Sequence, residues 1–487
     1  MWLGLQTGAG RVSSATRAFA LPVTPCGTDD RRATREIGVG QRIEELAAFV
    51  ASARWDDVPD SVRRHTKRVL LDTLGVILAG GERPEVRRLR ERLSGGSGAT
   101  VYARGWQAQD ARTAALLNGI AGRSIELCEG LRFVSGQAAM QVLPGVLAVG
   151  EQAGSSGREM LMALLLGYEV AARLAGGFTP RPLAHQNGQV SLLAAAAAGA
   201  RLRGLDAGGV SRAMRIATTL VLTPSYTNAV AGATALNVAG GMSGFAAALA
   251  PDLALAGFEA QDNAVEEALG ELVGGGFKTD GLLDQLGTTW HITRNYFRLY
   301  ACCNPIHPAL DCLASALAEL RPEPEQIARI DCATYRFASV MRDPNPRNYF
   351  ASKYSLPHAA ATMVVRGHAG FGALDDKAVD DPAIAALRQR VTVTEDPAMT
   401  AVAPRLRPAR VTVTLTDGRS ATHACESHRG DFQAPFTDAE LRAKFADLAG
   451  VVLTAEGAVA VEQEVDRCEE WDNVGVLTAL FRRHGLA

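Results

Sequence analysis

The sequence predicts a mostly α-helical protein, in which a large all-helical domain is interrupted by a smaller α+β domain. Apolar residues recur with a helical period from about residue 41 to residue 290, and again over 436–487. Within 291–435, short segments of strand-forming residues are bounded by turn residues, which is typical of β-strands. Residues 1–40 show neither pattern and are expected to be a disordered extension, with an organellar presequence or an over-extended start as alternatives.

The helical domain is expected to consist of helices separated by glycines. Asp60 is a candidate N-cap for a helix that Gly80 and Gly81 end. Further helices are predicted over 111–128, 142–154, 160–175, 191–203 and 210–222. Many of them are rich in alanine and glycine, so their backbones can approach one another closely.

The inserted domain is expected to combine strands with short helices. Strands are predicted over 328–335, 390–394, 409–415 and 421–425, and the last two are joined by a turn at Asp417-Gly418. A short helix is predicted over 359–365. Helix returns at Thr437, whose spacing to Glu440 is that of a capping box, and again over 474–483.

Composition excludes several classes of partner. Hydrophobic residues make up 47% of the 487 residues and charged residues 21%, which is close to the average for globular proteins. The net charge of −2 gives no electrostatic reason to expect nucleic acid or an anionic membrane surface as a partner. No run reaches the roughly 18 apolar residues of a membrane span. The eight cysteines follow no paired framework, which favours a reducing compartment and a cytoplasmic location.

Several short motifs, in one order along residues 41–450, point to a known family. They are LLDTLG (70–75), LLNG (116–119), GYEV (167–170), CCNPIHP (302–308), KYSLP (353–357) and HRGD (428–431). Together they resemble the 2-methylcitrate dehydratase (MmgE/PrpD) family, which also contains cis-aconitate decarboxylases and an iminodisuccinate epimerase. The resemblance implies that the α+β domain is a lid over the helical domain, with the active site between them in a homodimer.

The resemblance also implies a chemistry without a metal or organic cofactor. A proton is removed beside a carboxylate of a small substrate, and water or carbon dioxide is then lost, or the carbon is reprotonated. Such a reaction requires a base near the C–H bond, cations for the carboxylates and an acid for the leaving group.

The first candidate site segment is 123–130, which aligns with a family stretch of the form His-x-x-Asp-x-Asp-Asp-Thr. Arg123 replaces its histidine, while Glu126, Cys128 and Glu129 replace its aspartates. On a helix end, Glu126 and Glu129 would share a face and could act as acid and base. The alternative is that the two carboxylates only cap or solvate the helix, and Cys128 is expected to be a structural thiol.

Two further candidates lie before apolar helices. Gln137 stands where the family usually has a histidine, and it donates hydrogen bonds but exchanges no proton near neutral pH. His185 matches a family histidine ahead of the alanine-rich helix and could serve as a base or as a donor to a carboxylate. Surface-loop placement is the alternative for His185.

The family's Lys-x-Leu-His stretch has lost its charged groups in this chain. Thr234 and Asn237 take the two positions, which suggests a substrate with fewer negative charges or a different binding pose. Arg298 replaces another family lysine, just before Tyr300, and can bind a carboxylate with two hydrogen bonds. A structural ion pair is the alternative role for Arg298.

The remaining candidates lie on the α+β domain. His307 matches a family position at a helix start. Lys353 and His358 flank the residues YSLP (354–357), and His358 could supply the missing proton exchange. A thiol nucleophile at Cys302 or Cys303 is set aside because no base is oriented toward either sulfur. A metal site at His423, Cys425 and His428 is set aside because no fourth ligand is evident.

The sequence therefore predicts a lyase or isomerase that removes a proton alpha to a carbonyl of a small carboxylate-bearing substrate. His185 or the Glu126/Glu129 pair would be the base, Arg298 would bind a carboxylate, and His358 would return a proton. The usual tricarboxylates are less expected than a less anionic substrate. Two alternatives remain: a catalytically degenerate binding protein, and a biosynthetic enzyme for a larger acyl substrate.

Overall fold

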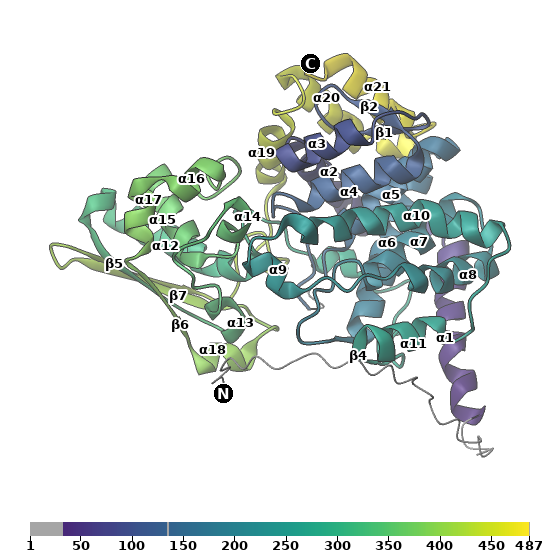
Figure 1. Cartoon of the computed structure of the whole chain (residues 1–487), viewed down its shortest axis with the longest axis horizontal. Coiled ribbons are helices and arrows are strands. Elements are labelled where there is room, and N and C mark those ends of the chain that lie inside the picture. The colour runs from purple at the N-terminus through teal and green to yellow at the C-terminus, as the bar shows by residue number, and fades with distance from the viewer. Residues whose placement is uncertain (1–32, 134–135, 487) are drawn as a thin grey trace, which may run out of the picture.

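The structure is a computed structural model that describes residues 33–133 and 136–486. Figure 1 shows a large helical part beside a smaller part built on a twisted sheet. Helix α1 (Ala33–Ser52) begins inside the segment expected to be disordered. The disorder prediction for residues 1–32, which precede this helix, concerns residues that the structure does not describe.

The helical part is built from apolar helices that pack around one large hydrophobic core, beside a smaller cluster around residues 99–103 and 111–117. Besides α1, its longer helices are α2 (Asp60–Gly81), α3 (Pro84–Arg92), α4 (Ala111–Arg123), α5 (Ala138–Ala153), α6 (Gly157–Gly177), α7 (Val190–Leu202), α8 (Ala207–Ala217) and α10 (Val238–Leu255). Short elements connect them: β1 (Ala99–Val101), β2 (Gln107–Gln109), β3 (Phe178–Pro180), α9 (Tyr226–Val230), α11 (Ala264–Glu267) and β4 (Gly274–Phe277). The predicted helices 142–154, 160–175 and 191–203 are confirmed within a few residues.

Glycines let α4 and α10 cross at very close range. A side chain at Gly119 would come within 2.6 Å of the carbonyl oxygen of Gly240 and 2.7 Å of the Cα atom of Gly241. Helix α10 also packs on α5 and on the alanine-rich α7. The expectation that alanine and glycine bring these backbones together is therefore confirmed.

Two apolar helical segments pass the length and composition test for a membrane span, Gly157–Gly177 and Thr234–Leu255. In the 18-residue windows that pass the test, 83% and 61% of the residues, respectively, are buried inside the protein. Burial of this extent is typical of helices in the core of a globular fold.

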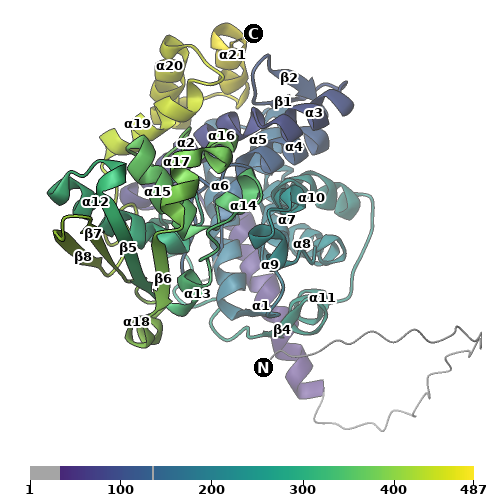
Figure 2. The same ribbon diagram turned by 60° about the vertical axis from the view of Figure 1, so that its left-hand side comes forward.

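The smaller part contains a four-stranded sheet with the order β6-β5-β7-β8. The strands are β5 (Ile327–Thr334), β6 (Val391–Glu395), β7 (Ala409–Leu415) and β8 (Ser420–Cys425), close to the predicted bounds. Strand β5 pairs with β6 in parallel and with β7 in antiparallel fashion. Helices α12 (His307–Leu320), α15 (Leu356–Arg366) and α17 (Pro382–Arg388) belong to this part (Figure 2), together with the short helices α13 (Arg336–Ser339), α14 (Tyr349–Ser352), α16 (Asp376–Asp380) and α18 (Pro397–Val402).

The chain returns to the helical part after the sheet. Helices α19 (Asp438–Ala449), α20 (Ala455–Asp466) and α21 (Gly475–His484) lie in the upper part of Figure 1, where α19 and α20 pack on α2 and α21 packs on α20. Thr437 caps α19, and Glu440 completes the predicted capping box. The second hydrophobic core, that of the sheet, also includes Ile125 and Leu127, so the segment after α4 lies where the two parts meet.

Two sequence expectations about helix ends were wrong. Helix α4 ends at Arg123 rather than near residue 128. The N-cap of α2 is Pro59, which provides no side-chain hydrogen bond, and Asp60 is the first helical residue. The proline ring fixes φ at a value that suits the start of a helix, and it disfavours a helical conformation at the residue before it. Pro59 therefore sets the start of α2 without a polar cap.

Candidate active site

A cavity of about 270 Å³ lies between the helical part and the sheet part. The helical part contributes Arg123, Glu126, Gln137, His185 and Tyr226 to its lining. The other polar and aromatic residues of the lining are Arg181, Gln186, Tyr296, Arg298, Cys303, Asn304, Phe337, Tyr354 and Arg407. The cavity thus joins four residues proposed from the sequence, Glu126, Gln137, His185 and Arg298.

A cluster of buried charges forms one wall of the cavity. Glu126 is paired with both Arg123 and Arg298, and each of the three side chains is 1% exposed. Arg298 also donates to the backbone oxygen of Glu126 at 2.9 Å. The Tyr354 hydroxyl donates to Oε1 of Glu126 at 2.7 Å and accepts from Nη2 of Arg123 at 3.0 Å. Two guanidinium groups and a phenol therefore fix the carboxylate of Glu126.

The chain places Glu126 in the cavity by leaving the helix early. Asp110 caps the start of α4, and the helix ends at Arg123. Glu126 then adopts a φ of 55°, in the left-handed region that residues other than glycine rarely occupy. Strain of this kind is typical of functional sites, where the surrounding contacts enforce it. The expectation that Glu126 and Glu129 share a helix face was wrong, because neither residue is in the helix.

Glu129 lies behind the cavity and does not line it. Its side chain is fully buried, accepting from the Tyr168 hydroxyl at 2.8 Å and from the backbone N–H of Ala139 at 2.9 Å. Ala139 is in the first turn of α5, so Glu129 supplies the cap that Gln137 does not. Burial raises the pKa of Glu129 to about 7, although both hydrogen bonds oppose the shift.

His185 is presented to the cavity as a neutral imidazole. Its Nδ1 atom accepts from the backbone N–H of Asn187 at 3.2 Å, so the neutral ring carries its proton on Nε2. Burial, and then the charges of Arg123 and Arg298, lower the pKa of His185 to about 3. The ring stacks on Tyr226, with centroids 5.6 Å apart and planes 13° apart.

Gln137 is connected to the same loop. Its side-chain oxygen accepts from Nδ2 of Asn187 at 3.1 Å. Asn187 therefore contacts His185 through its backbone and Gln137 through its side chain. This arrangement makes Gln137 a neutral part of the cavity wall that also fixes the His185 loop.

Arg407 adds a third buried guanidinium to the lining. It is 7% exposed, pairs with Oδ1 of Asn304 and donates to the backbone oxygen of Arg132 at 3.1 Å. Neither Arg407 nor Tyr226 lies in a recognised motif, and the sequence interpretation missed both residues. Arg123 and Tyr354 fall inside family-like motifs, where a search for cations and phenols would have found them.

Thr234 and Asn237 do not line the cavity. Thr234 begins a short 3-10 helix and is exposed to solvent. Asn237 is 2% exposed, and its side-chain amide has no hydrogen-bond partner among the residues described. Neither position supplies a charge to the site.

Tyr300 and His307 are buried beside the cavity but outside its lining. The Tyr300 hydroxyl donates to Asp311 at 2.7 Å. Nε2 of His307 lies 3.2 Å from the backbone oxygen of Cys302, and burial followed by the neighbouring His428 lowers the pKa of His307. Both rings pack together, with centroids 5.2 Å apart.

Lys353 and His358 also lie away from the cavity lining. Nζ of Lys353 donates to the backbone oxygen of Leu374 at 2.6 Å, and burial lowers the pKa of Lys353 to about 7. His358 is fully buried, with Nδ1 at 3.3 Å from Nη1 of Arg388. Burial and then Arg388 lower the pKa of His358 to about 3, so it is a neutral group of the second core.

The histidines and cysteine considered for a metal are not gathered in one place. His423 pairs with Glu319 at 2.8 Å at the edge of the sheet, whereas His428 contacts Asn304 at 2.7 Å in the interior. Cys425 contacts the thiol of Cys312 instead, with the sulfurs 3.5 Å apart.

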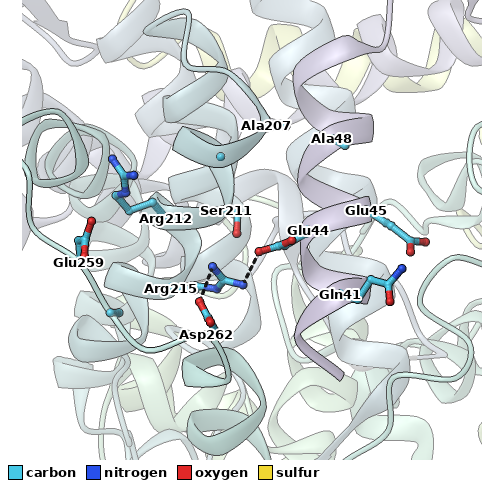
Figure 3. Close-up of a pocket in the computed structure, with 12 residues that line it drawn as sticks. Gln41, Glu44, Glu45, Ala48, Ala207, Ser211, Arg212, Arg215, Glu259 and Asp262 are labelled. Atoms are coloured by element: carbon cyan, nitrogen blue, oxygen red, sulfur yellow. Dashed lines mark hydrogen bonds and ion pairs between the residues drawn. The ribbon is translucent and has the colours of Figure 1, made fainter. Parts of the chain in front are cut away.

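A larger groove, of about 660 Å³, lies between α1 and α8 (Figure 3). Figure 3 shows Arg215 between Glu44 and Asp262, to which it is paired at 3.0 Å and 3.3 Å. Both acidic partners are largely exposed. Arg215 is thus paired within the groove, and its carboxylate partners are exposed rather than buried. The smaller cavity, whose ion pairs are buried and whose histidine has a shifted pKa, is the better candidate for chemistry.

The fold and the cavity define a mostly helical protein with an arginine-rich pocket between its two parts. Residues 44–274 match the MmgE/PrpD N-terminal domain, and residues 300–470 match the MmgE/PrpD C-terminal domain. The chain belongs to the MmgE/PrpD family.

The relatives carry the name of one activity. A cis-aconitate decarboxylase-like protein of Aspergillus oryzae is 24% identical over 91% of this chain and 97% of its own length. The cis-aconitate decarboxylase of Aspergillus terreus is 23% identical over 86% of this chain and 92% of its own. The mouse cis-aconitate decarboxylase is 23% identical over 90% of this chain and 93% of its own. The family and these relatives indicate a dehydratase- or decarboxylase-type lyase.

Proposed function

We propose that the protein is a lyase or isomerase that removes a proton beside the carboxylate of a small dicarboxylate substrate. The observation that carries this proposal is one cavity in which buried arginines, one fixed carboxylate and one neutral imidazole meet. Its volume lies at the low end of ligand sites (~300–1,000 Å³), which favours a small substrate over a larger acyl compound.

The charge of the lining supports a dianion. Three buried arginines, Arg123, Arg298 and Arg407, face one buried carboxylate, Glu126, which leaves two buried positive charges without an anionic partner in the lining; the fourth arginine of the lining, Arg181, is exposed to solvent, which screens its charge. Nε of Arg123 has no hydrogen-bond partner among the described residues. Two substrate carboxylates would balance this charge, whereas a third would be buried uncompensated. The proposal therefore excludes the usual tricarboxylates as preferred substrates.

Glu126 is proposed as the proton acceptor and His185 as a hydrogen-bond donor. Because Nδ1 of His185 already accepts a hydrogen bond, its Nε2–H is the group free to face a substrate oxygen. A neutral imidazole of this kind polarises a carbonyl or carboxylate without taking its proton. Glu126 takes the proton from carbon and becomes a neutral acid, while the electron pair moves into the carboxylate as an enolate-like charge. Glu126 then returns the proton to a departing β-hydroxyl group, which leaves as water, to the carbon that carbon dioxide leaves, or to the original carbon, and is a carboxylate again.

Hydrogen–deuterium exchange tests the first step without knowledge of the product. The protein is incubated in D2O with malate, citramalate, mesaconate, maleate, cis-aconitate and 2-methylcitrate, and proton NMR follows loss of C–H signal and appearance of products. We expect exchange or turnover with at least one dicarboxylate and none with Arg298→Met. Absence of exchange with every compound would refute the proposed function, and efficient turnover of cis-aconitate or 2-methylcitrate would refute the preference for a dianion.

One observation favours a second candidate, a binding protein without catalysis. Glu126 already occupies Arg123 and Arg298, as an inhibitory anion would. Calorimetry separates the two, because a degenerate site would bind a dicarboxylate without exchanging its protons. Homodimer formation and a cytoplasmic location stay predictions, and sedimentation equilibrium measures the first.

A further inference from the structure

Tyr226 is held beside His185 by the backbone. Residues Ala184 and Ser225 form an antiparallel bridge. Within it, the His185 N–H donates to the oxygen of Pro224 at 2.8 Å, and the Tyr226 N–H donates to the oxygen of Leu183 at 2.8 Å. The near-parallel stack of the two rings is therefore fixed by main-chain hydrogen bonds rather than by side-chain packing alone.

The hydroxyl group of Tyr226 is buried and has no hydrogen-bond partner among the described residues, although Tyr226 lines the cavity. A buried hydroxyl without a partner is costly, so such groups are generally satisfied by water or by a ligand. Burial raises the pKa of Tyr226, so the phenol keeps its proton at every physiological pH.

We propose that Tyr226 is a catalytic residue that, together with His185, forms a pair of neutral hydrogen-bond donors to the substrate oxygen on which negative charge develops. This inference rests on the proposed function and assigns a further residue to the same reaction. The phenol donates to the oxygen and keeps its proton throughout, so Glu126 alone takes and later returns the proton removed from carbon.

Neutral donors have a different task from the arginines. The arginines attract carboxylates equally well before and during the reaction, whereas short-range donors gain most as charge accumulates on the oxygen that they face. Tyr226 lines the same cavity as Arg123 and Arg298, so its hydroxyl can act on a substrate that these arginines bind. Phe337 from the sheet part also lines the cavity and packs on Tyr226, with ring centroids 5.7 Å apart.

The test compares Tyr226→Phe with Tyr102→Phe. Tyr102 is 1% exposed and lies against Phe481 far from the cavity, so the control removes a buried hydroxyl of the same kind. We expect Tyr226→Phe to lower the exchange rate at saturating dicarboxylate by about 100-fold, with the Kd for the dicarboxylate changed less than about threefold. A Tyr226→Phe rate within about threefold of the wild-type rate would refute the donor role, as would an equal loss in Tyr102→Phe.

A binding measurement separates this inference from the proposed function. Oxalate, a planar dianion, resembles an enolate of a carboxylate, and calorimetry gives its affinity even where no substrate turns over. We expect oxalate to bind Tyr226→Phe at least about tenfold more weakly than the wild type, and succinate to bind both equally. Equal oxalate affinity in the two proteins, or no oxalate binding by the wild type, contradicts the donor pair, while absent proton exchange contradicts only the proposed reaction.

Discussion

Glu126 and Glu129 are three residues apart, but their side chains lie in different electrostatic environments. Both side chains are at most 1% exposed. Glu126 is paired with two arginines at the cavity, whereas Glu129 has only neutral hydrogen-bond partners and a pKa raised by burial to about 7. Burial alone therefore does not decide the charge of a carboxylate in this protein. The neighbouring cations do, and they select Glu126 as the acidic group of the site.

Removal of a cation gives the largest expected effect. Arg298→Met should lower kcat/KM for the dicarboxylate by about 1,000-fold or more, because it removes a carboxylate ligand and leaves Glu126 with Arg123 alone. Steady-state kinetics measure the loss, and circular dichroism reports whether the variant folds. Arg298→Lys is the matched control, since it keeps the charge but not the two-pronged donor, and it should recover part of the rate. A fully active Arg298→Met protein would break the comparison.

Neutralising Glu126 gives the next largest effect and a distinctive split. Glu126→Gln keeps the shape of the side chain but cannot accept a proton, so we expect kcat to fall by about 100-fold or more. The Kd for a dicarboxylate should stay the same or become smaller, because the variant no longer competes for Arg123 and Arg298. Weaker ligand binding with an unchanged kcat would show that Glu126 serves binding rather than proton transfer.

Glu129→Gln should change stability and leave catalysis alone. The folded-state pKa of about 7 lies above the unfolded value of 4.5, so the folded protein binds more protons between these values. Stability from this group is therefore present below pH 4.5 and is lost as the pH rises through 7, by about 2 kcal/mol between pH 5 and 8. Urea unfolding at several pH values should show this dependence in the wild type and its loss in Glu129→Gln, with kcat unchanged within about threefold. A large fall in kcat would make Glu129 part of the proton path.

Sequence patterns predicted the elements well, because helical and strand periodicity are local. The bounds of β7 and the capping box of α19 follow directly from residues that are neighbours in the chain. The site was harder to predict, since the same reasoning extended α4 to residue 128 and placed Glu126 and Glu129 on one face of the helix end. Beyond the actual end of the helix, Glu126 is bound through its backbone and side chain by Arg298, which lies 172 positions away. Tyr226 reaches His185 through a main-chain bridge that no spacing rule describes.

The smallest expected effect concerns His185, whose pKa is lowered by burial and then by the same cations that hold Glu126. After burial, the charges of Arg123 and Arg298 are what lower its pKa to about 3. Proton NMR of the His185 ring, assigned with His185→Gln, should therefore show no titration between pH 5 and 8 in the wild type. In Arg298→Met the pKa should rise by about one pH unit, because one like charge has gone while burial remains. A wild-type His185 that titrates near pH 6.5 would mean that the ring is solvated and gains charge within the physiological pH range. His185 would then not be a permanently neutral donor beside the charged acceptor Glu126.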